Sequence, residues 1–181
     1  MNTLDYCKKV RYQKTILFLK KYMPPPCKVL DLGTPNDFSE IMRSAGYDVE
    51  NTQGENLDID FKKASESDAD LITAFEIFEH MLAPFNLLNN IKNKKLIASI
   101  PLKLWFASAY WNENEDWDKH YHEFEPKQFK LLLKRSNWNI IQSEKWKSYN
   151  PKKIGFRPIL RRIYPRYYIV YCEKHNQLNQ R

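Results

Sequence analysis

Two carboxylates and an imidazole follow one another closely in the stretch LITAFEIFEHM, which spans residues 71–81. The apolar run that opens this stretch is typical of a buried strand. Glu76, Glu79 and His80 come directly after it, where a strand would end. Side chains of these types can bind a metal ion, accept a proton or stabilise a helix. The spacing alone leaves all three interpretations open.

A metal site would use the three side chains together. Residues three and four positions apart lie on one face of a helical turn, so Glu76, Glu79 and His80 are expected to point the same way. Two carboxylates and an imidazole suit a hard or borderline divalent ion such as Mg2+ or Mn2+. Such an ion would bind substrate hydroxyl groups and lower their pKa.

The other two interpretations need no metal. Carboxylates near a helix N-terminus are favoured by the helix dipole by about 0.3–1 kcal/mol, so Glu76 and Glu79 also suit a capping role. A histidine can instead act as a general base near neutral pH. His80, His120 and His122 are the candidates to accept a proton from a substrate hydroxyl or amine.

Length and composition set the frame for these residues. A chain of 181 residues with 43% hydrophobic residues suits one domain with a substantial core, and we predict a single domain over 1–181. Lys and Arg exceed Asp and Glu by 29 to 22, which favours anionic partners. Richness in Lys and Asn also fits a biased genome composition, so the charge does not by itself identify a partner.

The cysteines and the apolar runs exclude several classes of protein. Three cysteines without a close pair predict neither a disulfide framework nor a cysteine-based zinc site. No apolar run reaches the length of about 18 residues that a transmembrane helix needs, so an integral membrane protein is not expected. Lys8, Lys9, Arg11 and Lys14 interrupt every apolar run near the N-terminus, which argues against a signal peptide. We expect a cytoplasmic protein.

Strand patterns alternate with helix patterns through most of the chain. We expect an N-terminal helix within 1–24, a core over 27–147, a basic excursion over 148–166 and a last strand over 167–173. This order predicts an α/β fold whose mostly parallel sheet has helices on both faces and an antiparallel last strand. The expected strands are 28–33, 47–53, a short 57–61, 70–75, 95–101, 138–146 and 167–173, and the expected helices are 3–22, 38–45, 84–91 and 126–136.

Four motifs in order resemble class I S-adenosylmethionine-dependent methyltransferases. VLDLGTPNDFSEIMRSAGYDV resembles the family's first motif, in which a strand ends in D-x-G-x-G-x-G and a helix follows. TAFEIFEHM is similar to the family's E-V-L-E-H, IASIP to its fifth strand, and HYHEFEPKQFKLLLKRSNW to the stretch before its sixth. The resemblance covers residues 27–147. It implies a Rossmann-like methyltransferase fold and methyl transfer from S-adenosylmethionine to an oxygen or nitrogen of an acceptor.

The resemblance also implies a set of cofactor-binding residues. The loop after the first strand would hold the methionine end, acids and an amide after the second strand would hold ribose and adenine, and the end of the strand at 70–75 would form the pocket floor. Pro35, Asp37 and Gln53 stand where the family usually has two glycines and an acid. A methyltransferase-fold binding module without cofactor is therefore the alternative. The implied cofactor-binding residues are Asp31, Gly33, Thr34, Asn36, Gln53, Glu55, Asp58, Asp60, Phe75 and Glu76.

A narrower resemblance concerns metal-dependent O-methyltransferases. The small-RNA 3′-end 2′-O-methyltransferases and ubiquinone-pathway O-methyltransferases are similar to this chain at E-x-x-E-H. In the RNA enzymes a further histidine lies upstream of a Glu-aromatic pair, and His120 in HYHEF fits that position. This resemblance implies Glu76, Glu79, His80 and His120 as ligands of Mg2+ or Mn2+.

Two further segments lie outside these motifs. Residues 104–111 together with Trp117 are dense in aromatic side chains, which suits either an acceptor pocket or a packed lid. The segment 152–166 carries six basic residues and no acid, interleaved with apolar ones. It suits an anionic small molecule, RNA or a lipid-linked substrate at a membrane surface, or else a solvated basic loop.

Overall fold

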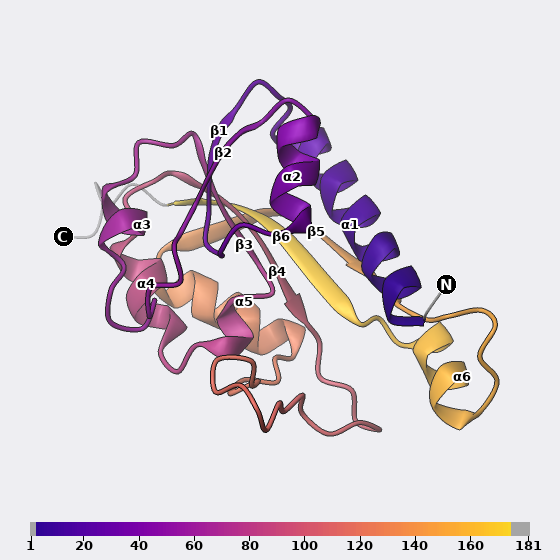
Figure 1. Cartoon of the computed structure of the whole chain (residues 1–181). Helices are drawn as coiled ribbons and strands as arrows, with labels where there is room; N and C mark the ends of the chain where they lie inside the picture. The colour runs from indigo at the N-terminus through magenta and orange to yellow at the C-terminus, as the bar shows by residue number, and fades with distance from the viewer. Residues whose placement is uncertain (1–2, 175–181) are drawn as a thin grey trace.

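The computed structural model describes residues 3–174, and it describes side chains from residue 6 onward. Residues 1–2 and 175–181 of the domain predicted over 1–181 lie outside the described residues. The strands form one sheet in the order β2-β1-β3-β4-β6-β5 (Figure 1). They are β1 (Lys28–Asp31), β2 (Asp48–Asn51), β3 (Leu71–Phe75), β4 (Lys95–Pro101), β5 (Trp138–Trp146) and β6 (Tyr167–Lys174).

Strand direction follows the sequence expectation. The strands β2, β1, β3 and β4 pair in parallel, whereas β6 runs antiparallel to both β4 and β5. Long crossover connections are what parallel pairs require, and a helix lies in the β1–β2 and β3–β4 connections. The predicted α/β class with an antiparallel last strand is confirmed.

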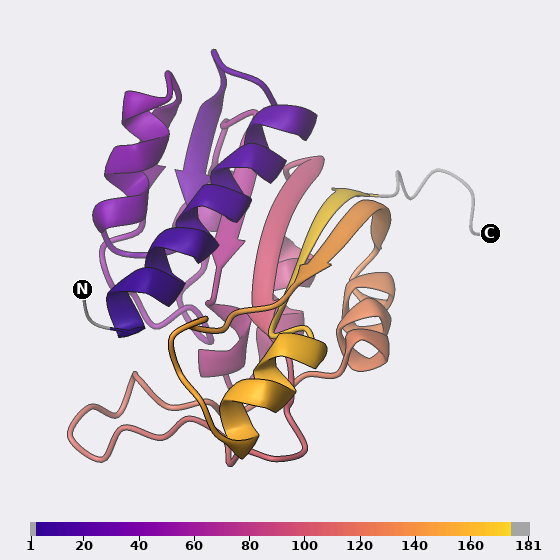
Figure 2. The same ribbon diagram turned by 90° about the vertical axis from the view of Figure 1, so that its right-hand side faces the viewer.

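Helices cover both faces of the sheet (Figures 1 and 2). On one face α1 and α2 pack over Val29, Leu71 and Ile97, and on the other α3, α4 and α5 pack over Leu30 and Ile72. The side chains of successive strand residues thus pack into the cores on opposite faces of the sheet. This explains why the sequences of these strands are continuous apolar runs. The helices are α1 (Thr3–Tyr22), α2 (Asp37–Ser44), α3 (Lys62–Glu66), α4 (Pro84–Asn90), α5 (Pro126–Arg135) and α6 (Phe156–Ile163), with a 3-10 turn η1 (Phe78–His80).

The helix α1 is long and lies along the sheet beside α2 (Figure 2). Its second half is anchored by Phe18 and Leu19, which are buried against the sheet, while Leu17 faces solvent. It ends at Tyr22, and prolines from position 24 onward cannot continue a helix. This anchoring fixes the first half of α1 over the sheet edge where β1 and β3 end.

Two segments differ from the sequence expectation. The short strand expected over 57–61 is wrong, because the side chain of Asn56 accepts a hydrogen bond from the Asp58 amide and its carbonyl accepts from Ile59 and Asp60. These bonds close a turn, which leads into α3. The solvated basic loop considered for 152–166 is instead built around α6. None of the helices within residues 3–174 is long and apolar enough to cross a membrane.

Candidate functional site

A cavity of about 350 Å³ opens at the carboxyl ends of β1, β3 and β4. Ligands of open α/β sheets bind at this edge, where loops from neighbouring strands converge. The helix α1 forms one wall. The lining residues are Arg11, Tyr12, Thr15, Asp31, Gly33, Thr34, Asn36, Phe38, Phe75, Glu76, Ile77, His80 and Ser99.

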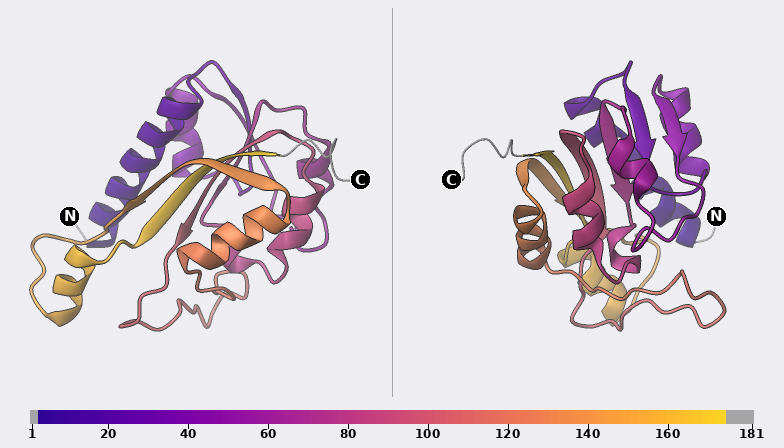
Figure 3. Two further views of the ribbon diagram at one scale, coloured as in Figure 1. Left: turned by 180° about the vertical axis from the view of Figure 1, so that it is seen from behind. Right: turned by 90° about the vertical axis from the view of Figure 1, so that its left-hand side faces the viewer.

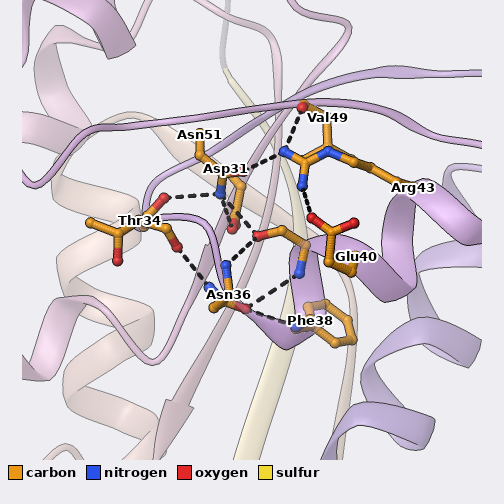
Figure 4. Close-up of polar contacts among 10 residues, drawn as sticks. Asp31, Thr34, Asn36, Phe38, Glu40, Arg43, Val49 and Asn51 are labelled. Carbon is orange, nitrogen blue, oxygen red and sulfur yellow. Dashed lines mark hydrogen bonds and ion pairs between the residues drawn. The ribbon is translucent and has the colours of Figure 1, made fainter.

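Asp31 at the end of β1 is the centre of a buried polar network (Figure 4). Thr73 on β3 donates to one carboxylate oxygen at 2.7 Å, and the Asn51 amide on β2 donates to the other at 3.1 Å. Asn51 also donates to the carbonyl of Gly33 at 2.9 Å and is held by Arg43. Burial raises the pKa of Asp31 to about 6, although these hydrogen bonds lower it in part. The network fixes the loop that leaves β1.

The loop after β1 is shaped by its own side chains. Asn36 caps α2 by accepting hydrogen bonds from the amides of Phe38 and Ser39, and its own amide donates to the Thr34 carbonyl (Figure 4). A Cβ placed on Gly33 would meet its nearest atom, on Ile77, at 3.5 Å, which is an ordinary contact. Packing within the protein therefore does not require glycine at position 33. The space beside its Cα atom is open to a ligand.

Glu76 lies at the cavity floor with a strained backbone. Its φ is +58°, a conformation that is uncommon for residues other than glycine. Ser99 donates to its carboxylate at 2.8 Å, and the Arg11 guanidinium lies 3.4 Å from the other oxygen. Burial raises the pKa of Glu76, and Arg11 opposes that rise. Burial alone would lower the pKa of Arg11, but Glu76 raises it, so the two charges support each other across the cavity.

Four predicted cofactor residues are placed apart from this cavity. Of the residues that the structure describes, the lining does not include Gln53, Glu55, Asp58 or Asp60. Asp58 accepts hydrogen bonds from the amides of Leu82 and Ala83 before α4, at 2.9 and 2.7 Å. Glu55 accepts from the backbone amide of Gln53, and Asp60 accepts from the amide of Lys62 at the start of α3. Their carboxylates serve the local backbone here.

Next to the cavity, Glu79, His80 and His120 come together. One ligand atom from each lies within 4.8 Å of the other two, which is close enough to hold a metal ion. Glu79 is buried, and neither of its carboxylate oxygens has a hydrogen-bond partner among residues 3–174. Burial raises the pKa of Glu79 well above its usual value, and Glu76 adds to the rise. An unpartnered buried carboxylate is costly, so a cation at this point would relieve it.

Both histidines of this cluster are oriented by other groups. Nδ1 of His80 lies 3.1 Å from the Lys119 carbonyl, and Nδ1 of His120 lies 3.1 Å from the Glu123 carboxylate. An acceptor at Nδ1 places the proton there and leaves Nε2 with a free lone pair, as in metal-binding histidines. Burial lowers the pKa of His80, which favours this neutral form.

The geometry corrects parts of the sequence interpretation. Glu76 does not share a helical turn with Glu79 and His80, because η1 begins only at Phe78. Neither acid caps a helix, since η1 and α4 lack side-chain caps among the described residues. His122 is separate from the cluster and faces the carbonyl of Leu82 at 3.3 Å. The candidate metal ligands that the structure brings together are therefore Glu79, His80 and His120, without Glu76.

Sequence reasoning missed the contribution of α1. Arg11, Tyr12 and Thr15 line the cavity from one face of the helix. The spacing of these three residues places them on one face of a helix. Basic residues recur along the whole of α1, however, so nothing distinguishes Arg11 in the sequence. Only its position over the ends of β1 and β3 gives it a role.

The aromatic segment forms a loop over the other side of the cluster. The ring of Tyr110 lies 5.2 Å from that of His120, and the His120 amide donates to the Tyr110 carbonyl. Trp105, Trp111 and Trp117 are half or more exposed, so this segment is not a packed lid. Its exposed rings are available to an acceptor or to a surface.

Comparison with known proteins identifies the family. Residues 6–143 match the family model described as a methyltransferase domain, while no curated protein matches the chain. The 1,6-didemethyltoxoflavin-N1-methyltransferase of Burkholderia thailandensis, solved with bound 1,6-didemethyltoxoflavin and S-adenosylhomocysteine, has a TM-score of 0.58 at 14% identity, over 91% of this chain and 78% of that one. An S-adenosylmethionine-dependent methyltransferase of Archaeoglobus fulgidus has a TM-score of 0.60 at 15% identity, over 90% and 94%. The chain therefore belongs to the methyltransferase-domain family and is an S-adenosylmethionine-dependent methyltransferase.

Proposed function

We propose that the cavity at the ends of β1 and β3 holds S-adenosylmethionine and that the methyl group goes to an oxygen or nitrogen of a bound acceptor. The observation that carries the proposal is the cavity itself, with Asp31, Gly33 and Glu76 at the strand ends. The Burkholderia structure supports the same class of ligand, because that relative binds S-adenosylhomocysteine. The substitutions at Pro35 and Asp37 leave the cavity open.

The lining suits a ligand that carries both charges. The Arg11 guanidinium is the cation of the cavity wall and would hold the carboxylate of the methionine end. Glu76 and Asp31 provide carboxylates for the ammonium group, and the unhindered Gly33 lets a ligand approach the backbone closely. When bound, the cofactor supplies an electrophilic methyl group. The remaining task of the protein is to hold the acceptor in line with it.

The acceptor side is formed by His80, His120 and the aromatic loop. His80 lines the cavity, so the Glu79, His80 and His120 cluster borders the space where a nucleophile would lie. The lowered pKa of His80 keeps its Nε2 available to accept a proton from a hydroxyl or amine. Tyr110 packs on His120 and holds this side of the site in place.

Thermal unfolding tests the proposal. S-adenosylmethionine and S-adenosylhomocysteine are each expected to raise the melting temperature, by a stabilisation of about 2.7 kcal/mol at a ligand concentration one hundred times Kd. Adenosine is the matched control, because it lacks the amino-acid end that Arg11 would bind. No shift with either ligand would contradict the proposal and favour the binding module without cofactor.

A second candidate function is metal-dependent O-methylation. It rests on the unpartnered Glu79 carboxylate, which lies beside ring nitrogens of His80 and His120. These three side chains would hold Mg2+ or Mn2+, and such an ion would lower the pKa of an acceptor hydroxyl. Titration with Mn2+, followed by electron paramagnetic resonance, is expected to show one saturable site. A signal of free Mn2+ only, at every protein concentration, would contradict it.

A further inference from the structure

The helix α6 projects from the body of the protein (Figure 3). Its apolar side chains are exposed. Phe156, Ile159 and Ile163 are 68%, 52% and 60% exposed, and Ile154 just before the helix is 94% exposed. None of the described residues of α6 is buried. An apolar helix face that covers no core is a sign of a binding surface.

The same helix separates apolar and basic side chains cleanly. Phe156, Ile159 and Ile163 follow helical spacing along one side, whereas Arg157 and Arg161, four residues apart, lie along another. The sequence has no acidic residue from position 145 to position 172, so the segment that contains α6 carries basic residues and no acid. This is the pattern of helices that lie in the plane of a membrane surface.

Aromatic side chains extend this surface toward the site. The ring of Tyr164, which follows α6, lies 6.3 Å from Trp105 and 6.1 Å from Phe106. Trp105 is 65% exposed. Arg166 exchanges hydrogen bonds with Leu102 just after β4, so α6 is attached at the sheet end that holds the cavity. Figure 2 shows α6 and the aromatic loop at the same end of the molecule.

We propose that α6, with Ile154 and Trp105, docks onto an anionic membrane surface. The basic residues would meet the headgroups, and the exposed Phe, Ile and Trp side chains would enter the boundary of the acyl chains. RNA phosphates would pair with the same cations, but RNA offers no apolar surface to bury three exposed isoleucines. The apolar face therefore favours the membrane. The docking goes beyond methyl transfer and needs neither cofactor nor acceptor.

Flotation with vesicles tests the docking. Vesicles of equimolar phosphatidylcholine and phosphatidylglycerol are expected to carry the protein upward, whereas pure phosphatidylcholine vesicles are not. Two variants separate the contributions: Phe156→Ser with Ile163→Ser removes the apolar face, and Arg157→Gln with Arg161→Gln removes charge. Each pair is expected to lower the partition coefficient about tenfold.

Matched controls lie on α5. Leu131→Ser removes an apolar side chain that is 56% exposed, and Lys127→Gln with Lys130→Gln removes two exposed cations. These changes are expected to leave flotation unchanged, and thermal unfolding of every variant is expected to match the wild type. The proposal is overturned if the apolar variant floats like wild type, if neutral vesicles bind equally, or if no vesicle binds. Binding of single-stranded RNA that is lost only in the charge variant, together with absence of flotation, would assign the surface to RNA.

Discussion

Asp31 makes the stability of the protein depend on pH. Burial raises its pKa from 3.8 to about 6. A carboxyl group with a higher pKa in the folded state stabilises the fold below its unfolded pKa, and this contribution is lost as pH rises through the folded pKa. Relative to Asp31→Asn, the wild type is expected to lose about 3 kcal/mol of unfolding free energy between pH 3.8 and about 6. Urea unfolding measures this, and a difference that stays constant over the interval would contradict it.

Glu79 tests the metal cluster. Glu79→Gln is expected to abolish the rise in melting temperature that Mn2+ gives the wild type, because it removes the one anionic ligand of the cluster. In the presence of a chelator the variant is expected to unfold no earlier than wild type, since a neutral amide replaces a buried, unpartnered carboxylate. Glu123→Gln, which weakens the hydrogen bond that orients His120, is expected to weaken Mn2+ binding about 10–100-fold. If Mn2+ raised the melting temperature of Glu79→Gln as much as that of the wild type, this cluster would not be the Mn2+ site.

Arg11 tests the wall that α1 contributes. Arg11→Gln is expected to weaken S-adenosylhomocysteine binding about tenfold or more, because a charge-assisted hydrogen bond to a carboxylate is worth about 1.5–3 kcal/mol. Lys14→Gln is the control, as Lys14 is exposed on the same helix and does not line the cavity. Calorimetry measures both. Equal affinity of the two variants for S-adenosylhomocysteine would show that Arg11 does not bind the ligand.

At the residue scale, the sequence could predict what local spacing and strand ends determine. Asp31 and Gly33 lie at the end of a recognisable strand, and Glu79 and His80 are neighbours in the chain. The proximity of His80 and His120 depends on a loop that returns to the site 40 residues later. It was predicted only through the resemblance to metal-dependent O-methyltransferases. Arg11 could not be predicted, since its role depends on where α1 lies.

The elements differ in how much they depend on packing, and α6 is the extreme. Replacing Phe156–Ile163 by a Gly-Ser linker of equal length is expected to change the unfolding free energy by less than about 0.5 kcal/mol, because no residue of α6 is buried. S-adenosylhomocysteine binding is expected to persist. Phe129→Ala on α5 is the contrast, because Phe129 is fully buried and its loss is expected to cost about 3–5 kcal/mol. Chemical denaturation measures both, and a large loss without α6 would contradict the exposed placement.

The same contrast explains which elements were predicted. The buried strands β3 and β4 appear as apolar runs, and their expected bounds agree with the structure within one residue. The alternation of LDIDF imitates a strand, but the turn bonds of Asn56 override it. The helix α6 was missed because glycine and prolines surround its helical spacing of Phe156, Ile159 and Ile163.

At the scale of the whole molecule, the sheet topology unites the site. Because β1, β3 and β4 are parallel neighbours, residues far apart in sequence such as Asp31, Glu76 and Ser99 meet at one edge. Four motifs in family order were enough to predict that arrangement. The order of the motifs does not specify that α1 covers the cavity or that α6 projects from the body of the protein. Both placements depend on side-chain packing.

Calorimetric titration of S-adenosylhomocysteine into the wild type and Gly33→Ala tests the central claim most directly. The added methyl group makes only ordinary contacts within the protein, so the variant is expected to keep the wild-type melting temperature. The wild type is expected to bind one-to-one with saturation, and Gly33→Ala at least about tenfold more weakly, because a ligand approaches the backbone at that position. No binding by the wild type, or equal binding by both proteins, would contradict a cofactor seated on this loop.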